Sequence, residues 1–226
     1  YRLDDLGRAL EAFKQAAALA PTNAEILFNL ASLHQELGEL EQARANYEAL
    51  VQFAPDHGLA LHNLGCCLYA AGALKEAETA LRRALELDPT AGRSWFVLGY
   101  VYESSGRGPS AIEAFHHAVH HDPENMEACL TLGQIYYRHY QPNAAIEAFR
   151  LAAEKEGPHQ AKAWFSLGET YRVKGANAEA IDAFQRCMRL NPERELAKLA
   201  QEILKSLGAK ASTFQFPSAT AGRAAR

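Results

Sequence analysis

The sequence predicts an all-α protein: a right-handed α-solenoid of stacked antiparallel helix hairpins with a C-terminal capping helix. Three observations lead to this fold class. Large and small apolar residues recur three and four positions apart, which is the spacing of helices with one buried face. Glycine and proline break that pattern at regular intervals, as they do between the helices of a hairpin. The whole pattern then repeats about every 34 residues, with marker prolines Pro21, Pro55, Pro89, Pro123, Pro158 and Pro192.

The stretch from Trp95 to Pro123 contains one such hairpin in full. Its first helix carries Trp95, Leu98-Gly99 and Tyr102, and its second helix carries Ala111, Phe115 and Ala118, on either side of a break at Gly106–Pro109. The resulting W-x-x-L-G-x-x-Y…A-x-x-x-F…P signature resembles the tetratricopeptide repeat. The resemblance covers about residues 1–194 and implies a protein-interaction module whose first helices line an inner, concave face.

The elements follow in order along the chain. Residues 1–23 are predicted to hold a partial repeat with only its second helix, so we expect the chain to be a fragment of a longer protein. That helix is expected to expose the apolar face formed by Leu6, Leu10 and Phe13. Five tetratricopeptide-like repeats are predicted over residues 24–194.

The turns inside the hairpins place glycine where a helix end needs a left-handed backbone, as at Gly38, Gly72 and Gly175. The fourth repeat has Tyr140-Gln141-Pro142 instead. Because tyrosine is strained in that conformation by about 1 kcal/mol or more, we expect this turn to differ in shape.

After the repeats, residues 195–207 predict one more amphipathic helix, of the kind that covers the last apolar face of a repeat array. Residues 208–226 are rich in Ala, Ser and Thr and contain no Asp or Glu. Such a composition predicts a flexible tail, whose one feature is Phe214-Gln215-Phe216-Pro217.

Composition excludes several function classes. The formal net charge is −4 and no basic face stands out, so nucleic-acid binding has no support. No apolar run approaches the ~20 residues of a membrane-spanning helix. The four cysteines lack zinc-ligand spacing, and Cys129 and Cys187 replace apolar or small core residues of other repeats. Reduced thiols favour a reducing compartment, and we expect a cytoplasmic protein.

No catalytic motif is present: we find no phosphate-binding glycine loop, no GxSxG and no HExxH, and we expect neither enzymatic activity nor a cofactor. The one cluster with metal-ligand chemistry is a set of four histidines, in which His116/His120 and His117/His121 are each four residues apart on a helix. Without an obvious third ligand, a solvated polar face is favoured over a metal site.

The candidate binding surface follows from the geometry of the predicted solenoid. Side chains of the first helices that point away from the Leu/Gly/Tyr packing set would line the inner face, and they are rich in aromatic residues. Either these rings pack between repeats, or they form an apolar groove for an extended peptide or a helix. The candidate residues are Phe28, Asn29, His62, Asn63, Tyr69, Arg93, Phe96, Tyr100, Tyr137, Arg138, Lys162, Phe165 and Arg172.

Asparagine can pair with an extended peptide backbone through its amide, as other members of the resembled family do at the positions of Asn29 and Asn63. The series stops there, because Val97, Thr131 and Ser166 occupy the matching positions.

The leading hypothesis is therefore a non-catalytic scaffold that binds a protein or peptide partner in its groove. A second hypothesis is self-assembly into a homo-oligomer, through the open half-repeat at 1–20 or through Phe214–Pro217. A third is the interaction module of a larger enzyme whose catalytic domain lies N-terminal to residue 1.

Overall fold

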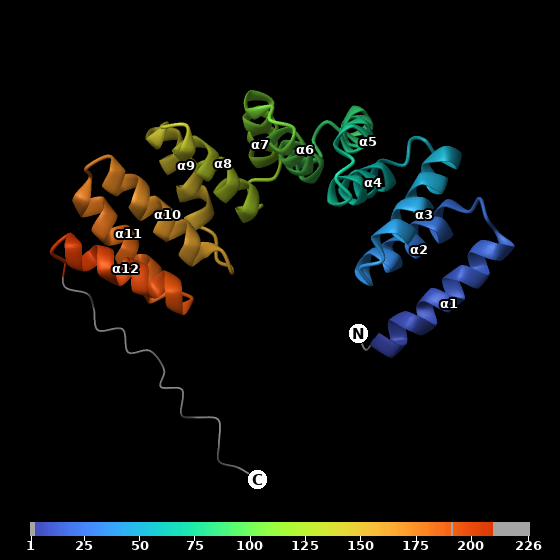
Figure 1. The fold of residues 1–226 in the computed structure, drawn as a ribbon, viewed down its shortest axis with the longest axis horizontal. Coiled ribbons are helices and arrows are strands. Elements are labelled where there is room, and N and C mark those ends of the chain that lie inside the picture. Colours follow the sequence, from blue (N-terminus) through green and yellow to red (C-terminus); the bar gives the residue numbers. More distant parts are fainter. Residues whose placement is uncertain (1–2, 191, 210–226) are drawn as a thin grey trace, which may run out of the picture. The chain divides into compact units, whose positions relative to one another are not determined.

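A computed structural model describes residues 3–190 and 192–209 of the chain (Figure 1). Within these residues the chain forms twelve α-helices and no strand, which confirms the predicted all-α class. The helices are α1 (Leu3–Leu19), α2 (Ala24–Glu36), α3 (Leu40–Phe53), α4 (Gly58–Ala70), α5 (Leu74–Leu87), α6 (Gly92–Ser104), α7 (Gly108–His121), α8 (Met126–Arg138), α9 (Pro142–Ala153), α10 (Gln160–Val173), α11 (Asn177–Arg189) and α12 (Arg194–Ser206).

The chain divides into two compact units, Tyr1–Asp122 (unit 1) and Pro123–Arg226 (unit 2). In unit 1 the helices pair as α2–α3, α4–α5 and α6–α7, and each hairpin packs on the next through α3–α4 and α5–α6. In unit 2 the hairpins are α8–α9 and α10–α11, joined by contacts between α9 and α10. The first helices also touch each other directly, α4 with α6 and α8 with α10. Each unit is thus a stack of helix hairpins.

Close approach depends on glycine in the first helix of four of the five hairpins, and Ala31 takes this place in α2. A Cβ atom added at Gly99 would lie 2.7 Å from the ring of Phe115, which is fully buried on α7. The same arrangement joins Gly168 to the ring of Phe184, where the distance would be 2.9 Å. Any side chain at these two positions would therefore have to displace a buried ring. This contact fixes which face of each first helix is buried and which is left outside.

The turn at Tyr140 keeps the shape of the glycine turns, so the sequence-based expectation of a different turn was wrong. Tyr140 has φ 56°, and its backbone N–H bonds to the carbonyl of Tyr137, as that of Gly106 (φ 72°) bonds to Glu103. The side chain of Tyr140 is 91% exposed, so its own packing does not hold the turn. The α8–α9 packing fixes the backbone there despite the strain of a non-glycine residue.

Helix α1 packs on α2, which also corrects an expectation. Leu10 was expected to be exposed but is only 8% exposed, because it contacts Leu30 and Leu33 of α2. Leu6 and Phe13 are partly buried beside this cluster. The apolar face of α1 is therefore largely used in packing within unit 1.

At the other end, α12 covers α11. Ala197 and Ala200 have no exposed surface and Leu204 is 2% exposed, in one cluster with Phe184 and Met188 of α11. The small residues of α12 let the two helices approach closely. The Phe214–Pro217 feature lies outside the described residues.

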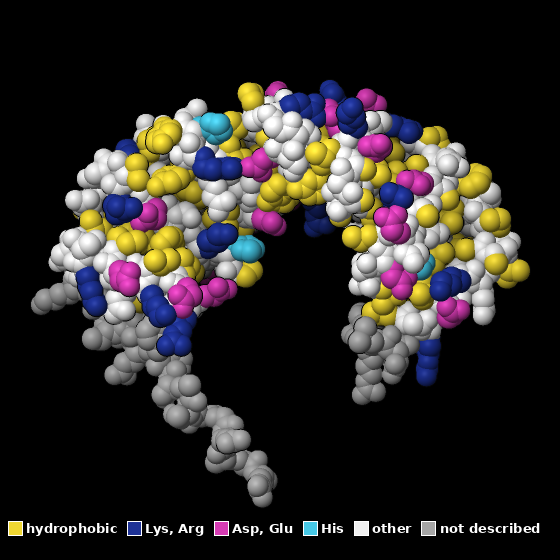
Figure 2. Space-filling view, viewed as in Figure 1, with side chains coloured by type: hydrophobic (Ala, Val, Ile, Leu, Met, Phe, Trp, Pro, Cys, Tyr) yellow, Lys and Arg dark blue, Asp and Glu magenta, His cyan; other side chains and the backbone are white. Residues whose placement is uncertain are grey.

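Cys129 and Cys187 are fully buried, as predicted from their repeat positions. Burial raises the pKa of the Cys187 thiol to about 12. The described residues include no helix with the length and apolar character needed to cross a membrane. On the face of the molecule shown in Figure 2, basic and acidic side chains are interspersed, without a region of one sign.

Candidate functional site

Three of the predicted residues form an aromatic cluster on the first helices of unit 1. The ring of Tyr69 on α4 stacks on Tyr100 of α6 with 6.3 Å between centroids, and Phe96 meets Tyr100 edge-on at 4.9 Å. Phe96 and Tyr100 both rest against the buried ring of Phe115, at 5.7 and 5.1 Å. All three predicted residues remain partly exposed. Packing and exposure therefore coexist: one edge of the cluster is used by the core and the other faces outward.

Three more of the predicted residues line a cleft of about 740 Å³ in the same unit, which we call the α4–α6 cleft. His62 and Asn63 come from α4, and Arg93 comes from the first turn of α6. Arg93 is exposed and has no ion-pair partner among the described residues. Asp88 and Asp122 also line the cleft, so its charge is mixed.

His62 is held on both sides. Its Nδ1 lies 3.0 Å from Oγ of Ser94 on α6, and its Nε2 lies 3.6 Å from Sγ of Cys66. Burial, and then the positive charge of Arg93, lower the pKa of His62 below its ordinary value of 6.5. The imidazole is therefore neutral at pH 7 and positions the cleft wall. Burial raises the pKa of the Cys66 thiol to about 11, so this thiol is protonated at neutral pH and is a poor nucleophile.

Asn63 is partly committed to the fold. Its Nδ2 donates to the hydroxyl of Tyr47 at 2.9 Å, and that hydroxyl also lies 3.0 Å from Oγ of Ser32. One amide hydrogen and the carbonyl oxygen of Asn63 remain for other partners. Asn29 is partly buried on α2. Phe28, beside it, stacks on His57 at 5.2 Å and meets Tyr47 edge-on at 6.0 Å, apart from the Tyr69 cluster.

The predicted residues of unit 2 are more dispersed. Phe165 of α10 packs edge-on against the buried Phe184 at 5.4 Å. Arg172 is held by both oxygens of Glu169, at 3.1 and 2.9 Å. Three others are exposed and lie on two helices: Tyr137 and Arg138 at the end of α8, and Lys162 on α10. The structure brings together two groups of predicted residues, and both are in unit 1.

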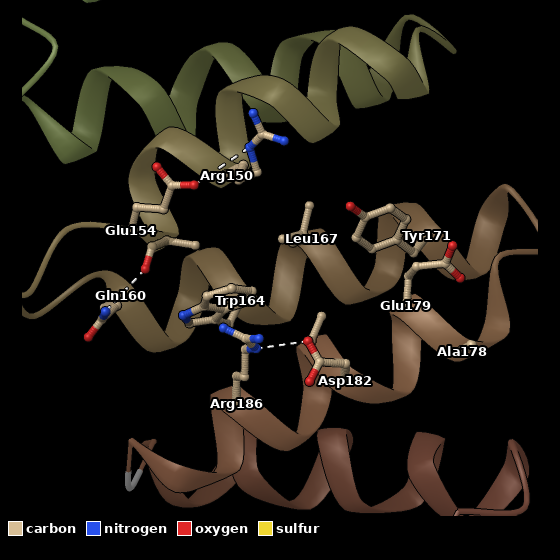
Figure 3. Close-up of a pocket in the computed structure, with 12 residues that line it drawn as sticks. Arg150, Glu154, Gln160, Trp164, Leu167, Tyr171, Ala178, Glu179, Asp182 and Arg186 are labelled. Carbon is tan, nitrogen blue, oxygen red and sulfur yellow. Dashed lines mark hydrogen bonds and ion pairs between the residues drawn. The ribbon is translucent and has the colours of Figure 1, made fainter.

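A second concave site was missed by the sequence analysis. Figure 3 shows a groove of about 770 Å³ in unit 2, walled by α9 and α11, which we call the α9–α11 groove. Its floor is Trp164, Leu167 and Tyr171 of α10, the residues that the repeat pattern assigns to packing. The guanidinium of Arg186 lies over Trp164 at 4.8 Å and pairs with Asp182 at 2.8 Å. The sequence did contain a signal for this groove: two large aromatic residues of the repeat signature lie on one helix, and residues of alternating charge flank them.

The histidine cluster is not arranged as a metal centre. His117 stacks on Trp95 at 4.4 Å and on His121 at 6.1 Å, and His120 is exposed. Across residues 3–190 and 192–209, no group of three or more His, Cys, Asp or Glu side chains could hold a metal ion.

Comparison with protein families matches most of the chain to one description, "Tetratricopeptide repeat". One profile of this family matches residues 22–90, and a second matches residues 63–125, 96–152 and 130–194. No curated protein sequence matches the chain at a significant level.

Solved structures of similar fold are numerous. A crystal structure of MamA is 26% identical, with TM-score 0.63, over 67% of this chain and 88% of MamA. YrrB, described as a TPR protein with an unusual peptide-binding site, is 24% identical, with TM-score 0.66, over 85% of this chain and 99% of YrrB. PilF of Pseudomonas aeruginosa is 20% identical, with TM-score 0.73, over 88% of this chain and 90% of PilF. The last two likenesses establish the fold.

Proposed function

This chain belongs to the tetratricopeptide repeat family, and from that premise we propose that it is a non-catalytic scaffold that binds a peptide or helix of a partner protein on the first-helix face of unit 1. Tetratricopeptide repeats are in general modules for protein–protein interaction. The finer proposal rests on one observation: the half-exposed rings of Tyr69, Phe96 and Tyr100 lie on the same two helices, α4 and α6, that line the α4–α6 cleft.

The aromatic cluster supplies the affinity in this proposal. Tyrosine and phenylalanine bury about 150–250 Å² each, and aromatic residues dominate many protein interfaces. Tyr69 and Tyr100 are already stacked on one another, and Tyr100 meets Phe115 edge-on, so little rotamer freedom is lost when a ligand covers their outer edges.

In this proposal the α4–α6 cleft orients the bound ligand. The remaining amide hydrogen and carbonyl of Asn63 match the alternating donors and acceptors of a peptide backbone. Arg93, exposed and unpaired within the described chain, suits a carboxylate of the ligand. We place a further contact area, on unit 2, at Tyr137, Arg138, Lys162, Phe165 and Arg172. Phe28 and Asn29 extend the unit 1 surface on α2.

The proposal is tested by selecting peptides from a random display library on the immobilised full chain. The affinity of a selected peptide is then measured by fluorescence polarisation for the wild type, Tyr69→Ala and Arg93→Ala. Tyr69→Ala is expected to weaken binding by about 2 kcal/mol, roughly 30-fold, and Arg93→Ala by less. Tyr140→Ala, which changes an exposed tyrosine outside this surface, is the matched control and should leave affinity unchanged. Peptides that bind all four proteins equally would contradict the proposal.

A further inference from the structure

Basic and acidic residues are distributed unevenly along the sequence. Residues 210–226 contain Lys210, Arg223 and Arg226 and no acidic residue, whereas the rest of the chain contains 20 Lys and Arg and 27 Asp and Glu. The segment is therefore +3 and the remainder −7. The same segment holds two aromatic residues, Phe214 and Phe216, followed by Pro217. In composition it is a basic peptide with aromatic anchors.

The α9–α11 groove has the complementary chemistry. Trp164 and Tyr171 offer aromatic surface on its floor, and Glu154, Glu179 and Asp182 contribute acidic groups to its walls. Two of these three acids are already paired with the arginines of the groove, Glu154 with Arg150 and Asp182 with Arg186. Glu179 has no ion-pair partner in the described part of the chain, and it is exposed.

An internal cation already uses this combination of groups. Arg186 places its guanidinium over the Trp164 ring and pairs with Asp182. A ring face beside a carboxylate attracts a cation through both the ring quadrupole and the negative charge. Tyr171 and Glu179 lie at the opposite end of the groove, where they again supply an aromatic and an acidic residue to its lining (Figure 3).

The described chain also ends near this groove. Leu207 and Ala209, just after α12, pack against the apolar cluster to which Tyr171 contributes. Tyr171 itself lines the groove. An extended chain covers about 3.3–3.6 Å per residue, so the five residues from Ala209 to Phe214 reach up to about 17 Å. Because Ala209 and Tyr171 pack against the same cluster, we take that length as sufficient for Phe214 to reach the Tyr171 end of the floor.

We propose that residues 210–226 bind in the α9–α11 groove of their own chain. Phe214 and Phe216 lie on the floor between Trp164 and Tyr171, and Lys210 lies beside Glu179. The segment thereby covers aromatic surface that would otherwise face water. An external partner with basic and aromatic residues must displace this segment before it binds the groove. This site is separate from the first-helix face of unit 1, so either proposal can fail without the other.

Photo-crosslinking in the full chain tests the proposal. The photoreactive amino acid p-benzoylphenylalanine replaces Phe214, the protein is irradiated, and the adducts are mapped by mass spectrometry. We expect the crosslinked protein to have the size of a monomer, with adducts in the peptides that contain Trp164, Tyr171 or Asp182. Glu179→Lys should lower the yield of these adducts about two- to fivefold, as expected for loss of one exposed charge pair. Raising the salt concentration should lower it further.

Two controls separate docking from chance contact. Glu202→Lys makes the same charge change on α12, outside the groove, and should leave the yield unchanged. The same photoreactive residue at Tyr140, on the α8–α9 turn, should give no adduct at Trp164. Adducts spread over other surfaces, the absence of adducts, or a band of dimer size alone would overturn the proposal; the last would assign the groove to a second copy.

Discussion

The side of α6 that carries Trp95 and Tyr102 in unit 1 and the floor of the α9–α11 groove in unit 2 are built from the same repeat positions. Trp95 and Tyr102 in one correspond to Trp164 and Tyr171 in the other. In unit 1, Arg107 lies over the Tyr102 ring at 4.3 Å and pairs with Glu78 through two contacts, of 3.2 and 2.5 Å. This pair links the start of α7 to α5 beside the Tyr102 ring.

In unit 2 the link is missing. Ala176 stands at the position of Arg107, and the buried Ile146 stands at the position of Glu78. Trp164 is covered by the Arg186 side chain, whereas Trp95 is covered by the His117 ring. The α9–α11 groove, with a volume of about 770 Å³, lies over this part of unit 2.

The difference shows which residues decide access in a repeat protein. The repeat places residues at the same positions of every first helix, and Trp and Tyr both fill two of these positions only in the third and fifth repeats. Whether a ligand can reach these residues depends on residues outside the signature, such as Arg107. Function in such a fold follows from these variable positions and not from the fold itself.

The largest expected effect comes from removing the buried ring behind each first helix. Phe115→Ala and Phe184→Ala should each lower the free energy of unfolding by about 3–5 kcal/mol, because both rings are fully buried. Phe115→Ala should lower the free energy of unfolding more than Phe184→Ala. The rings of Phe96 and Tyr100 both lose an edge-on partner in the first variant, whereas the ring of Phe165 loses one in the second. Urea unfolding of the full chain, followed by circular dichroism, measures both. A larger loss for Phe184→Ala would contradict this ranking of the two units.

The fold was predictable because the same local residue pattern recurs in each repeat. The period of 34, the prolines and the glycines at Gly99 and Gly168 report backbone contacts that recur in every hairpin. Two expectations failed for one reason: tertiary packing overrode a local preference. The Tyr140 backbone is held in a strained conformation by its neighbours, and Leu10 is buried by α2.

The candidate site was predictable only in part. The helical period places Tyr69 and Tyr100 on one face, because that requires only the direction of Cβ atoms. It does not show that Asn63 donates to Tyr47, sixteen residues away, since that bond depends on side-chain rotamers across two hairpins. The α9–α11 groove was missed although Trp164 and Tyr171 on its floor belong to the repeat signature, because that signature assigns both residues to packing.

A smaller effect is expected at the hairpin turns, where the two units also differ. Tyr140→Gly should raise the free energy of unfolding by about 0.5–1 kcal/mol, because glycine removes the strain at φ 56° while the added backbone freedom of the unfolded chain offsets part of the gain. Little packing is lost, since Tyr140 is 91% exposed. Gly106→Ala, at the equivalent turn of unit 1, should instead destabilise by about 1–2 kcal/mol. Thermal unfolding of both variants checks the sign of each change in stability. A destabilised Tyr140→Gly protein would show that the turn is not strained.

The smallest effect concerns the Arg107–Glu78 pair beside the Tyr102 ring of unit 1. The hydrogen bond from Arg107 lowers the pKa of Glu78 below its ordinary value of 4.5. A carboxyl with a lowered pKa in the folded state stabilises the protein above its unfolded pKa, and this contribution is lost as the pH falls through the folded value. The Arg107→Ala variant should therefore be less stable than the wild type at pH 7, and the gap should narrow as the pH falls below 4.5.

Urea unfolding of the two proteins between neutral and acidic pH measures that gap, and subtracting one profile from the other removes the contribution of the other carboxylates. Lys162→Ala, which removes an exposed cation without an ion-pair partner among the described residues, is the control and should give a profile parallel to the wild type. The same Arg107→Ala variant should leave the Tyr102 ring more accessible, because its guanidinium cover is gone. A stability gap that stays constant with pH would mean that Glu78 does not carry the linkage, and the difference between the two units at this position would then rest on the shape of the arginine side chain alone.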